Sequence, residues 1–160
     1  MVCRPMRTLL ALLFVTTFVT SASAQGLGYA EGGFAGFSGF FGRASNSFHI
    51  GGGGELVVAD RVGIGGEFGF FDRLIVGSAN ATVHLGGLRD VRVSPFVTGG
   101  YSRLGIGDGE GAFSAFNIGA GLHYWAADRI GFRVEFRDHF RPDDRGTTQY
   151  WSLRAGIAFR

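Results

Sequence analysis

From residue 28 onward, hydrophobic and polar residues alternate along most of the chain. In the clearest stretch, Ile130, Phe132, Val134 and Phe136 occupy every second position, and glycine, arginine and glutamate fill the positions between them. A period of two places successive side chains on opposite faces of a β-strand. Runs of this kind predict eight strands, at residues 28–37, 47–58, 62–71, 76–86, 92–103, 114–125, 130–139 and 150–159.

One part of this pattern occurs twice. Residues 53–68 are echoed at 121–136, a shift of 68 positions, and both copies contain an Ala-Asp-Arg turn between two alternating runs. Glu67 and Glu135 occupy the same position in the second run of each copy. A hairpin that returns in this form indicates a closed, repetitive β-structure. The sequence leaves open whether the echo is a duplication or a convergence.

Two all-β architectures fit eight such strands: a membrane barrel with its apolar face outward, and a soluble secreted domain with its apolar face inward. The polar faces of the clearest runs are rich in glycine. Glycine weakens a strand that faces water, but it leaves room for long charged side chains inside a narrow barrel. Runs of about ten residues also match a tilted strand that crosses a bilayer. The sequence therefore favours an all-β, eight-stranded antiparallel up-and-down transmembrane β-barrel.

The connections and the strand ends add two expectations. The connections after the first, third, fifth and seventh runs are mostly longer than those after the second, fourth and sixth. This predicts long loops at one end of the barrel and short turns, together with both termini, at a periplasmic end. Aromatic residues near the strand ends are expected to form interfacial girdles: Tyr29, Tyr101, Tyr124, Trp125, Tyr150 and Trp151.

The first 24 residues have a different composition. Arg4 and Arg7 precede an apolar stretch at residues 9–19, and Ala22-Ser23-Ala24 offers a small-residue cleavage site. This arrangement predicts a secretory signal peptide at 1–24 and a single barrel domain at 25–160. Removal of two arginines would leave 13 of the 15 basic residues against 13 acidic ones. The resulting charge balance does not favour a nucleic-acid partner.

These features resemble the outer-membrane β-barrel domains of the OmpA/OmpX type. The resemblance covers residues 25–160 and rests on the eight alternating runs, the two Ala-Asp-Arg turns, residues 133–137 and a last strand that ends on the aromatic Phe159. It implies residence in the bacterial outer membrane, contact with outer-membrane lipid and lipopolysaccharide, and delivery by the barrel assembly machinery. No peptidoglycan-binding domain is expected, so that part of the OmpA role is not carried over.

Six charged residues are expected to face the narrow interior. An isolated charge in such an enclosure costs several kcal/mol, so opposite charges should pair. Glu67 and Glu135 are expected to bridge to the interior arginines and to close the lumen to free ion flow. Four histidines are expected on the same inner face: His49, His84, His123 and His139. The predicted lumen charge network consists of Glu55, Glu67, Arg133, Glu135, Arg137 and Arg154.

A structural or surface-interaction role is therefore expected, and no catalytic, cofactor-binding or metal-binding residue is assigned. A narrow pore and a lipid-modifying enzyme of the lipid A deacylase class are the alternatives. Such an enzyme needs a serine and a histidine at the lipid-facing side, whereas Ser47 and His49 are expected to point inward. Loops at 38–46 and 104–113 are the expected places for a surface ligand, which the sequence does not identify.

Overall fold

The chain closes into a β-barrel. The computed structural model describes residues 25–38, 45–59, 61–71, 73–86, 88, 91–106, 111–143 and 146–160. Within these residues lie eight strands: β1 (Gln25–Ser38), β2 (Ser45–Ala59), β3 (Val62–Phe71), β4 (Leu74–His84), β5 (Val93–Ile106), β6 (Ala112–Trp125), β7 (Ile130–Asp143) and β8 (Gly146–Phe159). Each strand pairs with its sequence neighbours, and β1 pairs antiparallel with β8, so the sheet has no free edge. The predicted fold class is confirmed. The predicted signal peptide lies outside the described residues.

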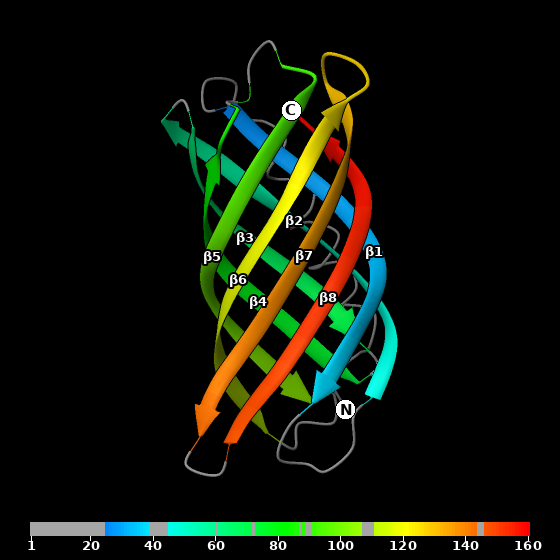
Figure 1. The fold of residues 1–160 in the computed structure, drawn as a ribbon, viewed down its shortest axis with the longest axis vertical. Helices are drawn as coiled ribbons and strands as arrows, with labels where there is room; N and C mark the ends of the chain where they lie inside the picture. The colour runs from blue at the N-terminus through cyan, green and yellow to red at the C-terminus, as the bar shows by residue number, and fades with distance from the viewer. Residues whose placement is uncertain are drawn as a thin grey trace, which may run out of the picture.

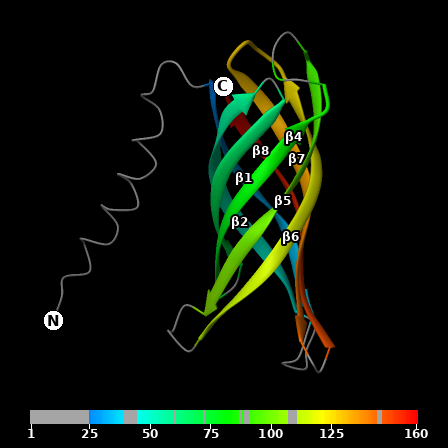
Figure 2. The same ribbon diagram turned by 90° about the vertical axis from the view of Figure 1, so that its left-hand side faces the viewer.

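The two ends of the barrel are distinguished by the chain direction. β1 begins and β8 ends at the same end, at the top of Figure 1, which we call the proximal end. The connections from β1 to β2, β3 to β4, β5 to β6 and β7 to β8 lie at the opposite, distal end. Figures 1 and 2 show all strands tilted against the long axis of the barrel.

Most strands extend further at the distal end than the alternation predicts. β2 and β4 to β8 each continue by two to four residues beyond the predicted runs. Alternation requires one apolar and one polar environment, so it fades where both faces of a strand meet the same solvent, while the backbone pairing continues. Pairs such as Gly105↔Ala112 and Asp143↔Gly146 lie in segments that the sequence assigned to loops. The expectation of longer distal connections is therefore wrong, because paired strand replaces much of their length. The middles of the loops at 38–46 and 104–113 lie outside the described residues.

The two faces of the wall have opposite polarity. Large hydrophobic side chains on the outer face are about half exposed, as for Phe132 at 57 %, Phe136 at 50 % and Leu153 at 51 %. The inner face buries Glu, Arg, His, Asn, Ser and Thr side chains instead. A water-soluble domain has the reverse arrangement, whereas a membrane barrel has this one. Within the described part of the chain, no helix is long and apolar enough to cross a membrane.

The expected aromatic girdles are half right. Tyr101, Tyr124 and Trp151 lie on the outer face, with 52 %, 42 % and 37 % of their surface exposed. Trp125 and Tyr150 are buried in the interior. The reason is the strand period itself: in each of the pairs 124/125 and 150/151, one residue must point inward if the other points outward. The remaining girdle residue, Tyr29, also points inward, where its hydroxyl reaches Glu67.

Apolar clusters occupy the interior at both ends. At the proximal end, Leu27, Leu88, Trp125 and Ala158 are buried together. At the distal end, the cluster consists of Ala35, Phe71, Val76, Leu104, Ala115 and Tyr150. An apolar cluster thus lies at each end of the interior, and most of the buried charged side chains lie between the two clusters.

Candidate functional site

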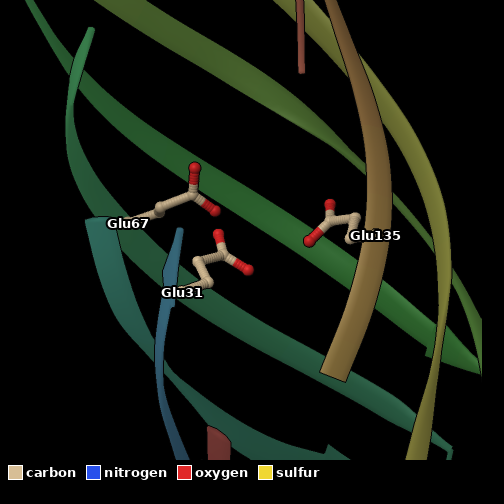
Figure 3. Close-up of side chains that lie close together, drawn as sticks. All are labelled: Glu31, Glu67 and Glu135. Atoms are coloured by element: carbon tan, nitrogen blue, oxygen red, sulfur yellow. The ribbon is translucent and has the colours of Figure 1, made fainter. Parts of the chain in front are cut away.

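Three glutamates converge in the middle of the interior. Glu31 on β1, Glu67 on β3 and Glu135 on β7 each offer a carboxylate oxygen, and these oxygens lie within 4.8 Å of one another. Figure 3 shows the three side chains pointing toward a common centre from different strands. Each is at most 6 % exposed. By themselves, three such carboxylates could hold a hard cation.

Three arginines occupy the space around these carboxylates. Arg133 lies 2.5 Å from Glu135 and 3.5 Å from Glu31. Arg154, on β8, reaches all three carboxylates, at 2.7 Å from Glu31, 2.5 Å from Glu67 and 3.1 Å from Glu135. The third cation is Arg137, on β7. All three guanidinium groups are at most 2 % exposed.

Arg137 completes the charge balance of the cluster. It lies 3.0 Å from Glu67 and 2.6 Å from Glu135. Three positive charges then face three negative charges, and every carboxylate has at least two guanidinium partners. Such pairing offsets the desolvation that burial imposes on each ion. The geometry is therefore that of a neutral ion-pair network, since the guanidinium groups occupy the directions from which a metal ion would be bound.

Aromatic and polar groups hold the network in place. The Arg133 guanidinium lies 4.1 Å from the centre of the Tyr29 ring and 4.2 Å from that of Phe96. Cation–π contacts of this kind favour a desolvated guanidinium. The Tyr29 hydroxyl donates to Glu67 at 3.1 Å, and Arg133 donates to His123 Nε2 at 2.9 Å. The network is therefore fixed on several sides by groups from the barrel wall.

A hydrogen-bonded pair of His84 and Glu55 lies apart from the network. His84 Nε2 and Glu55 Oε1 are 2.6 Å apart, with side-chain exposures of 0 % and 5 %. The His84 ring lies 6.1 Å from the Phe96 ring at a tilt of 50°, and Arg133 also contacts the Phe96 ring. Of the six predicted lumen residues, the structure therefore brings together Glu67, Arg133, Glu135, Arg137 and Arg154, and it places Glu55 inside the barrel with another partner.

Sequence reasoning missed Glu31, although it binds two arginines of the network. In β1, most outward positions carry glycine or alanine, so the contrast between the faces is weak. One signal was present: Phe34 lies an odd number of positions from Glu31 and is 71 % exposed on the outer face. Its parity places Glu31 on the inner face.

Inner-face glycines lie beneath large side chains of neighbouring strands. A Cβ atom added to Gly53 would meet the Tyr29 hydroxyl oxygen at 2.6 Å, and one added to Gly121 would meet the Phe96 ring at 2.6 Å. Glu55 covers Gly63 in the same way. Glycine on the inner face thus makes room for charged and aromatic neighbours.

The distal histidines are engaged with Tyr150. His49 Nδ1 lies 2.7 Å from the Tyr150 hydroxyl, and His139 Nδ1 lies 3.3 Å from the Tyr150 carbonyl oxygen. His49 and His139 are 1 % and 2 % exposed. Ser47 belongs to the same strand face as His49 and is partly buried. The serine and histidine considered for lipid chemistry are thus turned away from the outer face.

Comparisons with known proteins identify the fold. No family model matches the sequence, and no curated protein sequence matches it. The N-terminal β-barrel domain of Pseudomonas aeruginosa OprF is similar in structure, with a TM-score of 0.65, 19 % identity, and coverage of 85 % of this chain and 97 % of that one. Neisserial surface protein A gives a TM-score of 0.66 at 12 % identity, covering 84 % and 96 %. The outer-membrane protein OprG from Pseudomonas aeruginosa gives 0.58 at 10 % identity, covering 85 % and 96 %. The expected resemblance to outer-membrane barrels is confirmed at the level of the fold.

Proposed function

We propose that the protein is a small outer-membrane β-barrel with a closed lumen and a structural or surface-interaction role. The observation that carries this proposal is the inverted polarity of the wall, in which hydrophobic side chains face outward around a charge-balanced interior. An exposed apolar belt of this kind would drive aggregation in water. In a bilayer, the same belt is the surface that the lipid requires.

The height of the apolar belt supports the proposal. On β8, the outward side chains from Trp151 to Phe159 are apolar, and the next outward residue toward the distal end is Gln149. Eight residue steps at ~3.3 Å each, tilted by ~40°, span about 20 Å along the barrel axis. This is close to the apolar band of ~25 Å in outer-membrane barrels. Outward polar residues also occur toward the distal ends of other strands: Asn46, Arg103, Ser114 and Asp138.

The interior supports a closed lumen over a narrow pore. The paired guanidinium and carboxylate groups fill its middle, and an apolar cluster closes each end. An ion on this path would have to break buried ion pairs and then pass an apolar constriction, and both steps cost energy. A lipid-modifying role is not favoured, because His49 bonds to Tyr150 inside the barrel.

The strand extensions support an orientation. Paired backbone continues beyond the apolar belt at the distal end, where β7 and β8 pair as far as Asp143↔Gly146. We infer that this end faces outward from the cell and meets lipopolysaccharide or a surface ligand, and that the proximal end, with both termini of the barrel, faces the periplasm. Insertion by the barrel assembly machinery belongs to the same proposal.

The proposal can be tested with protein extracted from the outer-membrane fraction. Unboiled protein should migrate faster than boiled protein on an SDS gel, because a compact barrel resists the detergent until it is heated. In planar bilayers it should show no conductance at the level of a general porin. Recovery in the soluble periplasmic fraction without a boiling-dependent shift would exclude the membrane barrel, and porin-level conductance would exclude the closed lumen.

A further inference from the structure

We propose that the proximal rim of the barrel binds the phosphate groups of anionic phospholipids in the membrane leaflet that faces this end. The surface consists of Arg61, Arg92 and Arg129, which we call the rim arginines. The inference rests on the proposed function, because it requires the apolar outer face to lie in a bilayer.

The rim arginines occupy one repeated position in the fold. Each directly precedes the first residue of a strand that rises from the proximal end, namely β3, β5 or β7. That first residue is in every case an apolar side chain on the outer face, at 37–51 % exposure: Val62, Val93 and Ile130. The arginines therefore lie immediately beyond the apolar belt, at the level where a bilayer places its headgroups.

The backbone holds these positions in place. The carbonyl oxygens of Arg61 and Arg92 accept hydrogen bonds at 2.7 Å from His84 and Trp125, and that of Arg129 accepts one at 3.1 Å from Arg160. All three residues are exposed. Within the described part of the chain, the structure gives their guanidinium groups no partner. Three guanidinium groups that have no partner among the described residues are thus carried by hydrogen-bonded backbone.

The surrounding charge is also positive. Across the proximal turns and the residue after β8, the sequence carries five arginines, at 61, 89, 92, 129 and 160, against three aspartates, at 60, 90 and 128. The Arg160 side chain already has partners within the protein. Its Nε donates to the Asp128 carbonyl oxygen at 2.8 Å, and its guanidinium lies 4.3 Å from the centre of the Trp125 ring. It adds positive charge beside the rim arginines without competing for their ligand.

Phospholipid phosphate is the anion that this placement fits. A guanidinium group binds phosphate through paired N–H donors, and its aliphatic stem can lie along an apolar surface while the charge stays at the interface. An anionic partner free in the aqueous compartment would have no reason to require an arginine directly before the first lipid-facing residue of three strands. The repeated Arg-apolar step at the start of three strands is the observation that favours lipid.

The test measures which lipid collects at the proximal rim. The full chain, with Cys3→Ser to remove its single cysteine and Ala127→Cys in the β6–β7 turn, carries a fluorescent probe at the rim. The labelled protein is inserted in two sets of phosphatidylcholine vesicles. One set contains a small fraction of headgroup-spin-labelled phosphatidylglycerol, and the other contains the same fraction of headgroup-spin-labelled phosphatidylcholine. Phosphatidylglycerol should quench the probe more strongly. The difference should shrink at salt on the order of 1 M, where the screening length falls to ~3 Å.

Variants assign the preference to the rim arginines. R61Q/R92Q/R129Q should lose the lipid preference, at roughly fivefold in local association for each arginine removed, whereas R61K/R92K/R129K should retain most of it. R103Q, at the distal end of β5, is the matched control and should leave quenching at the rim unchanged. Flotation with the vesicles and boiling-dependent gel migration verify that each variant is inserted and folded.

The outcomes separate this inference from the proposed function. Equal quenching by the two lipids, or a preference that survives the triple Gln substitution, would overturn the phosphate site while the inserted barrel stands. Binding to purified peptidoglycan that depends on the rim arginines, without a lipid preference, would assign the surface to a polymer and also overturn it. Failure of the parent chain to insert would overturn the membrane barrel and this inference with it.

Discussion

Glu67 and Glu135, the equivalent glutamates of the 68-residue echo, share two arginines. Arg137 lies 3.0 Å from Glu67 and 2.6 Å from Glu135, and Arg154 lies 2.5 Å and 3.1 Å from the same two residues. The echoed hairpins, β2–β3 and β6–β7, are four strands apart in the closed ring, so their glutamates approach the axis from opposite walls. Two like charges meet there, and the arginines between them make the arrangement stable.

Removal of Arg154 should destabilise the barrel strongly. Arg154→Met would leave three buried carboxylates with two arginines, and loss of one partner from a buried ion pair costs roughly 3–5 kcal/mol. The free energy of unfolding, measured by urea titration in lipid vesicles, should fall by about this amount. Arg103→Gln, on the exposed outer face, should change it by less than ~0.5 kcal/mol.

A second substitution can show that unbalanced charge causes this loss. Glu31→Gln removes the one surplus negative charge, so E31Q combined with R154M should be more stable than R154M alone. A double variant no more stable than R154M would mean that packing, and not charge balance, determines the loss.

The loss of stability caused by a charged side chain on the outer wall should depend on its depth in the bilayer. Val134 lies in the middle of the apolar belt, where its Cα partners are Leu122 and Ala155. Val134→Arg should lower the free energy of unfolding in vesicles by roughly 2–4 kcal/mol, and Val62→Arg, at the proximal boundary, by about 0–1 kcal/mol. The two valines have similar exposures, 41 % and 37 %. Equal costs at the two positions would contradict the placement of the belt.

Neighbouring glycines on β2 should respond differently to alanine. A Cβ at Gly53 would meet the Tyr29 hydroxyl oxygen at 2.6 Å and the Gly66 carbonyl oxygen at 2.5 Å, whereas one at Gly54 would find its nearest atom at 3.6 Å. Gly53→Ala should cost about 1–3 kcal/mol through overpacking, and Gly54→Ala should be nearly neutral. Urea titration of both variants gives the comparison, and a larger cost at Gly54 would reverse the assignment of the two faces.

The two tryptophans should report opposite sides of the wall. Trp151 is 37 % exposed on the outer face, and Trp125 is 4 % exposed beneath Arg160 in the interior. Brominated acyl chains should therefore quench the fluorescence of Trp125→Phe protein, which retains Trp151, and quench that of Trp151→Phe protein far less. Stronger quenching of Trp125 would show that the interior assignment is wrong.

The strength of the local pattern determined which interior residues the sequence could identify. In β7, bulky apolar residues flank Arg133, Glu135 and Arg137 at every second position, so their common face was predictable. In β1, small residues on the outer face concealed Glu31. Adjacent aromatic residues such as Tyr124 and Trp125 were assigned to one girdle, although a strand must separate them.

Which interior charges pair with one another could not be predicted from any single strand. Arg154 reaches Glu31 at 2.7 Å because β8 pairs with β1 in a register that sets Arg154 opposite Gly33 and Glu31 opposite Gly156. This register depends on the strand number and stagger of the whole barrel. Alternation therefore predicted which faces hold charge, and closure of the sheet determined which charges meet.

Pairing between β1 and β8 also constrains the order of folding. These strands lie at opposite ends of the described chain, and the Gly28↔Phe159 contact has a sequence separation close to the longest that this chain allows. Contacts between residues so far apart in sequence form slowly, because the chain loses loop-closure entropy before these contacts stabilise the fold. Until residues 146–159 are available, the growing sheet has two edges with unpaired backbone groups that other chains can join. The protein is therefore most vulnerable to aggregation just before its last strand docks, and not after the barrel has closed.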